Sequence, residues 1–87
     1  MLDWLRADLQ ANVQPWTIVY FHQPPYSKGS HDSDDAIEIY MKALRENFIP
    51  VMEEYGVDLI LNGHSHVYER SYLINGHYGN SSSWDPA

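Results

Sequence analysis

Apolar positions at the start of the chain predict a helix followed by a strand. Leu2, Leu5 and Leu9 recur at helical spacing with charged residues between them, so residues 1–11 are expected to form an amphipathic helix. The run at 16–21 (WTIVYF) is β-branched and aromatic and does not alternate with polar residues. Because such runs are typical of strands covered on both faces, we predict a buried strand here.

The middle of the chain predicts a loop and then two helices. Residues 22–35 contain two prolines, a glycine and a cluster of acids, and they fit neither the helical nor the strand period, so we expect a loop. A helical stripe then returns at Ile37, Tyr40, Met41 and Leu44. Because Pro50 disrupts the interior of a helix but suits its first turn, we predict separate helices at about 35–46 and 49–55.

The last third of the chain predicts a second strand and a hairpin. Residues 57–61 (VDLIL) follow a glycine that ends the preceding helix, and they have the composition of another buried strand. Strand, helix and strand together form a βαβ unit. The segments 67–74 and 77–78 flank Asn75 and Gly76, a dipeptide that strongly favours a β-hairpin. A turn-rich tail is expected after the hairpin.

These elements predict an α/β fold that is incomplete. Parallel strands are normally covered on both faces, whereas this sequence offers one set of helical segments to cover them. Two parallel strands and a hairpin also make a marginal sheet by themselves. We therefore expect residues 1–87 to be a fragment of a larger α/β domain.

Composition and charge narrow the functional classes. Eighty-seven residues are enough for one small domain. The net charge of −7 has the wrong sign for a groove that neutralises nucleic-acid phosphates. The longest apolar run is far shorter than the ~20 residues of a membrane-spanning helix, and the first residues do not resemble an export signal. We therefore expect no nucleic-acid groove and no membrane segment, and because cysteine is absent, any metal must bind to other side chains.

Three histidines follow the predicted strands at the points where the strands end. His22 comes directly after the first strand, and His64 and His66 follow the second after Gly63, which is expected to let the backbone turn tightly. A single histidine in such a place is more often a capping or hydrogen-bonding residue. However, the carboxyl ends of parallel strands share one edge of the sheet, where open α/β sheets bind ligands. The joint placement therefore favours a shared metal site.

The metal count cannot be decided from these side chains alone. Three neutral imidazoles satisfy one zinc ion with an open fourth position. Two divalent ions would need carboxylates that offset their charge, and these would have to come from elsewhere.

Two stretches of the sequence resemble a known family. FHQPPYSKGSHDSD at 21–34 and YGVDLILNGHSHVYERSYLINGHYG at 55–79 are similar to the carboxyl-terminal half of a calcineurin-like metallophosphoesterase domain, closest to the purple acid phosphatase group. The resemblance implies a four-layer α/β/β/α sandwich, of which the βαβ unit and the following hairpin would be a part. It also implies hydrolysis of phosphate esters by a metal-bound hydroxide at a dinuclear site, and a full-length protein that is secreted or periplasmic.

The resemblance also implies roles for individual residues. Matched by motif, His22 and His64 would bind the second metal ion and His66 the first, the pair being iron with zinc, manganese or iron. His31 would match the histidine that holds the substrate phosphate and helps to protonate the leaving group. Tyr26 lies in the same loop and is a candidate for lining the substrate pocket.

The front half of the family pattern is missing from this sequence. The D-x-[HG], G-D-x-x-[YD] and G-N-H-[ED] motifs, which supply the acidic and asparagine ligands, are absent. We therefore expect the chain to be inactive alone and to need the missing amino-terminal half of the domain as its partner. The alternative is a non-catalytic module that binds a single zinc ion through His22, His64 and His66, or that merely pairs with another chain.

Overall fold

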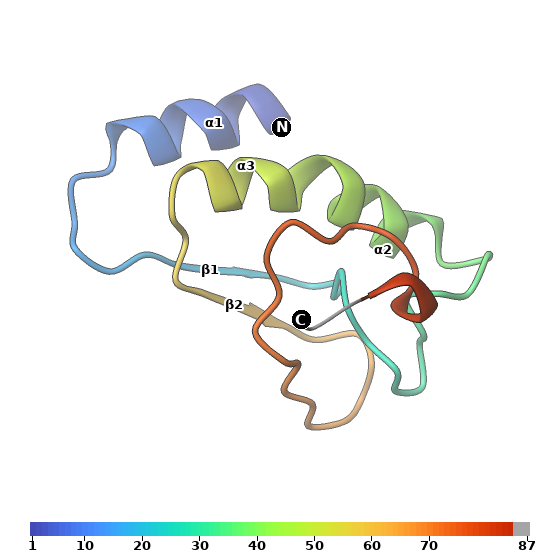
Figure 1. Ribbon diagram of the computed structural model, residues 1–87. Helices are drawn as coiled ribbons and strands as arrows, with labels where there is room; N and C mark the ends of the chain where they lie inside the picture. The colour runs from blue at the N-terminus through green and yellow to red at the C-terminus, as the bar shows by residue number, and fades with distance from the viewer. Residues whose placement is uncertain (85–87) are drawn as a thin grey trace.

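A computed structural model describes residues 1–84 (Figure 1). Its helices and strands are, in chain order, α1 (Leu2–Ala11), β1 (Ile18–Phe21), α2 (Ile39–Ala43), the π-helical segment η1 (Leu44–Phe48), α3 (Ile49–Glu54), β2 (Leu59–Asn62) and the 3₁₀ turn η2 (Ser81–Ser83). The predicted tail therefore contains one short helical turn, and its residues 85–87 lie outside the described part of the chain. None of the helices within residues 1–84 is long and apolar enough to cross a bilayer.

The sheet consists of two parallel strands. β1 pairs with β2 in a register that runs from Ile18 opposite Leu59 to Phe21 opposite Asn62. The polypeptide between them contains the helical segments, so the predicted strand–helix–strand order is confirmed. The result is a mixed helix and strand structure with a small parallel sheet, which is compatible with part of the α/β fold expected from the sequence.

The helix between the strands is continuous, and the predicted division at Pro50 is wrong. α2, η1 and α3 follow one another without a gap, and the helix begins at Ile39 rather than near residue 35. The backbone N–H of Ile49 donates to the carbonyl of Leu44, five residues earlier, which makes a wide turn just before Pro50. Because proline has no N–H to donate, we attribute the widened turn to this position.

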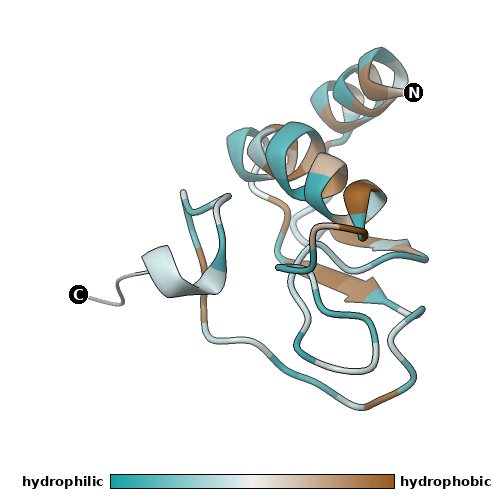
Figure 2. Cartoon of the chain, turned by 90° about the vertical axis from the view of Figure 1, so that its right-hand side faces the viewer, coloured by the Kyte–Doolittle hydropathy of each residue, from teal (hydrophilic) through white to brown (hydrophobic). Residues whose placement is uncertain are grey.

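The hydrophobic core lies on one face of the sheet. α1 and α3 supply its buried residues, which are Leu5, Leu9, Ile49, Val51 and Met52. Val19, Phe21 and Ile60 of the strands pack against this cluster. Figures 1 and 2 show α1 and the α2–α3 helix on the same side of the strands.

The opposite face of the sheet is exposed, so the prediction that both strands are buried on two faces is wrong. Ile18 and Tyr20 of β1 are 57% and 83% exposed, and Leu59 and Leu61 of β2 are 48% and 51% exposed. No second layer packs there within residues 1–84, because the chain's long helices are all used on the other face. The two strands are therefore covered on one face only, although their apolar composition is typical of strands covered on both faces.

The predicted hairpin does not form in the structure. Residues 67–78 contain no strand, although Gly76 adopts the left-handed φ of +75° that a turn requires. The flanking segment is held by α3 instead, because the N–H of Gly76 and the hydroxyl of Tyr78 both donate to the carboxylate of Glu53. The left-handed Gly76 expected of a turn is therefore present, but the segments on either side of it do not pair as strands.

A buried guanidinium ties three separate segments to the long helix. Arg45 is 1% exposed, and its Nε donates to the carbonyl of Tyr78 at 2.8 Å. Its Nη1 donates to the carbonyls of Ser33 at 2.9 Å and Pro25 at 3.4 Å. Arg45 therefore fixes both the loop after β1 and the carboxyl-terminal segment to η1.

The Asp34 carboxylate clips the same loop to η2. It accepts hydrogen bonds from Lys28 Nζ and from the backbone and hydroxyl of Ser81. Burial raises the pKa of Asp34, but the hydrogen bonds from Lys28 and Ser81 outweigh this effect and lower the pKa from 3.8 to about 2. Asp34 is therefore ionised at neutral pH.

The exposed sheet face should make the chain self-associate. We expect Leu61→Thr, on the open face, to raise the monomer fraction in size-exclusion chromatography with light scattering and to reduce binding of a hydrophobic dye. The matched change Val19→Thr, on the covered face, should lower the helical circular dichroism signal without improving solubility. A wild-type monomer with a sharp cooperative thermal transition would contradict this prediction.

Replacing Arg45 should destabilise the fold. In Arg45→Ala the carbonyls of Ser33 and Pro25 lose a buried donor, so we expect a loss of about 2–4 kcal/mol, measured as a lower urea midpoint of the helical signal. Arg6→Ala is the control, because Arg6 pairs with Glu54 at an exposed site and should change the midpoint little. Equal urea midpoints for the two variants would show that the buried guanidinium does not stabilise the fold.

The Asp34 clip should weaken in acid. Because its folded pKa is lowered, the stabilisation is present above pH 3.8 and is lost as the pH falls towards 2. The urea midpoint of Asp34→Asn should therefore lie below that of the wild type at pH 5, and the two should converge near pH 2. Asp35→Asn, at an exposed neighbouring position, serves as the control. A gap that stays constant from pH 5 to pH 2 would refute the assignment.

Candidate metal centre

The ends of β1 and β2 bring His22 and His64 together. The N–H of Gly63 donates to the carbonyl of His22 at 2.8 Å, which extends the strand pairing by one step beyond Asn62. His22 Nε2 and His64 Nδ1 are 3.3 Å apart, and the two rings meet edge to face at 73°. The expected convergence of these two side chains at the carboxyl edge of the sheet is therefore present in the structure.

His64 itself, and not Gly63, makes the tight turn at this edge. The φ of His64 is +64°, a left-handed conformation that side-chain-bearing residues rarely adopt. The N–H of Ser65 donates across it to the carbonyl of Gly63 at 2.7 Å. A Cβ at Gly63 would be 3.6 Å from His22 Nδ1, an ordinary contact. The expectation that Gly63 makes the tight turn is therefore wrong, because the strained residue is His64.

His31 and Glu38 complete a cluster around His64. The His31 ring stacks on the His64 ring with centroids 3.9 Å apart. His31 Nδ1 donates to Glu38 Oε1 at 2.6 Å, and Glu38 Oε2 lies 3.5 Å from His64 Nε2. The hydrogen bond from His31 lowers the pKa of the Glu38 carboxyl and outweighs desolvation, which acts in the opposite sense.

Glu38 was not predicted from the sequence as a residue of the site. It directly precedes α2, where it was assigned to the helix and not to the site. The available signal was its spacing of seven residues from His31 across a loop that must turn back before the helix begins. That spacing alone does not say which way the loop turns.

Buried serines hold the His31 loop against the His64 turn. Ser65 accepts a hydrogen bond from the N–H of His31 at 3.0 Å and donates to the His31 carbonyl at 3.1 Å. Ser33 and Ser27 close the loop on itself through their backbone and side-chain groups. A Cβ at Gly29 would lie 2.5 Å from Ser65 Oγ, so the loop packs against the turn closely enough to require glycine there. His31 is therefore positioned by a network of serine hydroxyl groups that extends from Ser65 through Ser27 to the Glu69 carboxylate.

Two other predicted site residues lie away from this cluster. His66 is exposed, and its backbone N–H donates to Ser30 Oγ at 3.3 Å. Tyr26 is half-buried against the core, and its hydroxyl donates to the carbonyl of His77. Burial raises the pKa of Tyr26 to about 12. The metal-binding role of His66 and the pocket-lining role of Tyr26 stay predictions.

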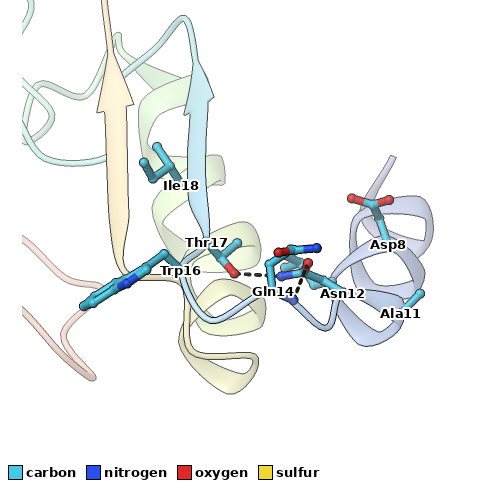
Figure 3. Close-up of a pocket in the computed structure, with 8 residues that line it drawn as sticks. Asp8, Ala11, Asn12, Gln14, Trp16, Thr17 and Ile18 are labelled. Atoms are coloured by element: carbon cyan, nitrogen blue, oxygen red, sulfur yellow. Dashed lines mark hydrogen bonds between the residues drawn. The ribbon is translucent and has the colours of Figure 1, made fainter.

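A separate hollow lies at the other end of β1. It measures about 380 Å³ and is lined by residues of α1, the following loop and the start of the strand, among them Asn12, Trp16 and Thr17 (Figure 3). Asn12 donates to the hydroxyl of Thr17 at 2.8 Å across it. Asp8 is the only titratable side chain among its lining residues. The hollow therefore lacks the imidazoles of the carboxyl edge.

The side chains of the cluster are ones that could hold a metal ion. Two imidazoles, His22 and His64, present ring nitrogens to each other at the sheet edge. On the other side of His64, ligand atoms of His31, Glu38 and His64 all lie within 4.8 Å of one another. Imidazole nitrogen with carboxylate oxygen is the donor set of catalytic zinc and other transition-metal sites.

Comparison with known proteins agrees with this chemistry. An acid phosphatase of Aspergillus ficuum is 40% identical over 74 residues, which cover 82% of this chain and 11% of that protein. Purple acid phosphatase 15 of Arabidopsis thaliana is 33% identical over 75 residues (83% of this chain, 13% of that protein), and acid phosphatase type 7 of Danio rerio is 35% identical over 100 residues (97% and 23%). The chain thus spans less than a quarter of the length of these relatives.

The family comparison covers most of the chain. No solved structure matches it significantly. A family model described as calcineurin-like phosphoesterase matches residues 2–68, which include the strand pair, His31 and the two histidines at the sheet edge. Together with the acid phosphatase relatives, this match shows that the chain belongs to the calcineurin-like phosphoesterase family.

Proposed function

We propose that this chain is the carboxyl-terminal part of a catalytic domain that hydrolyses phosphate esters at a dinuclear metal site. The observation that carries the proposal is the convergence of His22 and His64 where the two strands end, with His31 stacked against His64. This edge is where open α/β sheets bind their ligands. The names of the relatives, acid phosphatase and purple acid phosphatase, support a phosphate ester as substrate.

The residues present fit a bound metal ion. Two nitrogens that bind one tetrahedral zinc ion at about 2.0–2.1 Å are roughly 3.3 Å apart, and His22 Nε2 and His64 Nδ1 are separated by 3.3 Å. We therefore assign His22 and His64 to one ion of the pair and His66 to the other, the ions being iron with zinc, manganese or iron. When bound, such a pair lowers the pKa of a water molecule and neutralises the phosphoryl oxygens.

His31 is proposed to hold the substrate phosphate and to protonate the leaving group. Its Nδ1 is bonded to Glu38, so the ring orientation is fixed and Nε2 remains for the substrate. The serine network keeps this ring against the His64 turn, so that the proton is held at the correct place before substrate arrives.

The rest of the site must come from sequence outside this chain. The relatives extend far beyond the matched region, since the chain covers 11–23% of their lengths. We propose that the remainder supplies the missing carboxylate ligands and the second half of a four-layer α/β/β/α sandwich, which would cover the exposed face of β1 and β2. Residues 1–87 alone would then be inactive, and the full-length protein would be secreted or periplasmic.

Variants of a full-length protein test the roles of the histidines. His31→Ala should leave the metal content intact and lower turnover by roughly 10²–10⁴, the usual contribution of a positioned general acid. His22→Ala and His66→Ala should instead lose metal and nearly all activity, because the ligands fix the ion itself. Metal analysis and steady-state kinetics measure the two effects separately.

The leaving group provides the control for this experiment. The loss caused by His31→Ala should shrink for esters with good leaving groups, which need little protonation as the ester bond breaks. His77→Ala, a histidine bonded to Ser83 instead of the cluster, should change neither metal content nor turnover. If His31→Ala loses metal as His22→Ala does, or loses equal activity on every leaving group, the assigned role is wrong.

A further inference from the structure

We infer that His31, Glu38 and His64 form a site for a single zinc ion that is distinct from the proposed dinuclear centre. The two metal sites share the ring of His64, and zinc would also occupy His31, the proposed general acid. The proposed phosphatase assignment uses His64 Nδ1, which faces His22, whereas the site inferred here uses His64 Nε2, which faces Glu38. The inference does not depend on the proposed function, because it needs neither His22 nor His66.

The first observation is an unpartnered nitrogen. Within residues 1–84, His64 Nε2 is the buried side-chain polar atom that has no hydrogen-bond partner. The nearest carboxylate oxygen, Glu38 Oε2, lies at 3.5 Å, beyond the usual range of an N–H···O hydrogen bond. A buried nitrogen without a partner is costly unless something else satisfies it, and a cation is one group that can.

The second observation is the geometry of the three side chains. Their ligand atoms lie within 4.8 Å of one another. Ligands of a tetrahedral zinc ion are separated by roughly 3.3 Å, so the 3.5 Å between His64 Nε2 and Glu38 Oε2 already has the required spacing. His31 Nδ1 lies 2.6 Å from Glu38 Oε1, and zinc bound between these ligands would replace that hydrogen bond.

The donor set selects the ion. Two imidazoles and one carboxylate with an open fourth position are typical of zinc, whereas calcium and magnesium prefer oxygen ligands alone. The single carboxylate offsets half of the ion's charge, which three histidines would not do. The His64 turn and the His31 loop are joined through Ser65, so two of the ligands are held in place before the ion binds.

The ring of His64 makes the two uses mutually exclusive. With zinc on Nε2, the ring keeps its proton on Nδ1 and can donate it to His22 Nε2, 3.3 Å away. With a metal ion on Nδ1 instead, the proton moves to Nε2 and points at Glu38. Binding at both nitrogens would require loss of the ring proton altogether, so a neutral His64 serves one site at a time.

Zinc titration of the 87-residue chain tests the inference. Equilibrium dialysis at low protein concentration, with metal analysis, should give one zinc ion per chain. Glu38→Gln keeps the size of the side chain but removes its charge, and we expect it to weaken zinc binding about 100-fold, as should His31→Ala. His64→Ala should abolish binding, whereas magnesium in place of zinc should not bind measurably.

His22→Ala and His66→Ala are the discriminating variants. His22→Ala should weaken zinc binding less than Glu38→Gln does, because it removes the hydrogen bond from His64 Nδ1 but no zinc ligand. His66→Ala and the control His77→Ala should leave the affinity of the chain for zinc unchanged, and circular dichroism verifies that each variant keeps its helices. Loss of binding in His22→Ala or His66→Ala, with no effect of Glu38→Gln, would overturn the inference. That result would still support the proposed phosphatase ligands. Conversely, if His22→Ala and His66→Ala of the full-length protein kept their metal and activity, those ligands would be refuted, and the inferred zinc site would not be affected.

Discussion

The buried guanidinium of Arg45 is the interaction on which the arrangement of the site depends. The two strands can place His22 and His64, but the His31 loop has no secondary structure of its own to hold it. Arg45 binds the carbonyls of Ser33 and Pro25, one on each side of that loop, from the middle of the long helix. A buried charge is tolerated there because three carbonyl groups satisfy it. The loop that carries His31 is therefore anchored to the same helix that packs over the sheet.

His64 combines a strained backbone with two ring nitrogens that face other side chains of the site. Its backbone is left-handed, one ring nitrogen faces His22, and the other faces Glu38 without a hydrogen bond. Strained residues of this kind persist where the surroundings over-determine them, and they gather at functional sites. The hydroxyl of Ser65 supplies that constraint, because it accepts from the N–H of His31 and donates to the His31 carbonyl. One ring can thus take part in either of two metal arrangements.

The open face of the sheet links the fold to the partial match with the relatives. β1 and β2 are apolar on both faces, yet the core covers only the side that carries Val19, Phe21 and Ile60. Within residues 1–84, the candidate metal-binding group at the sheet edge contains one carboxylate, Glu38, whereas a pair of divalent ions needs several. The proposed function explains the missing layer and the missing carboxylates in the same way, since sequence beyond this chain would supply both.

The sequence by itself determined the helix–strand–helix–strand order and the convergence of His22 and His64, because hydrophobic periodicity and strand ends are local signals with one geometric consequence. It did not determine that no hairpin forms around Asn75 and Gly76, since a turn-forming dipeptide does not show whether the segments on either side of it pair as strands. Only the tertiary structure decided that Glu38 joins the histidines. A loop without a period can return along many paths, and long-range contacts to Arg45 select one of them.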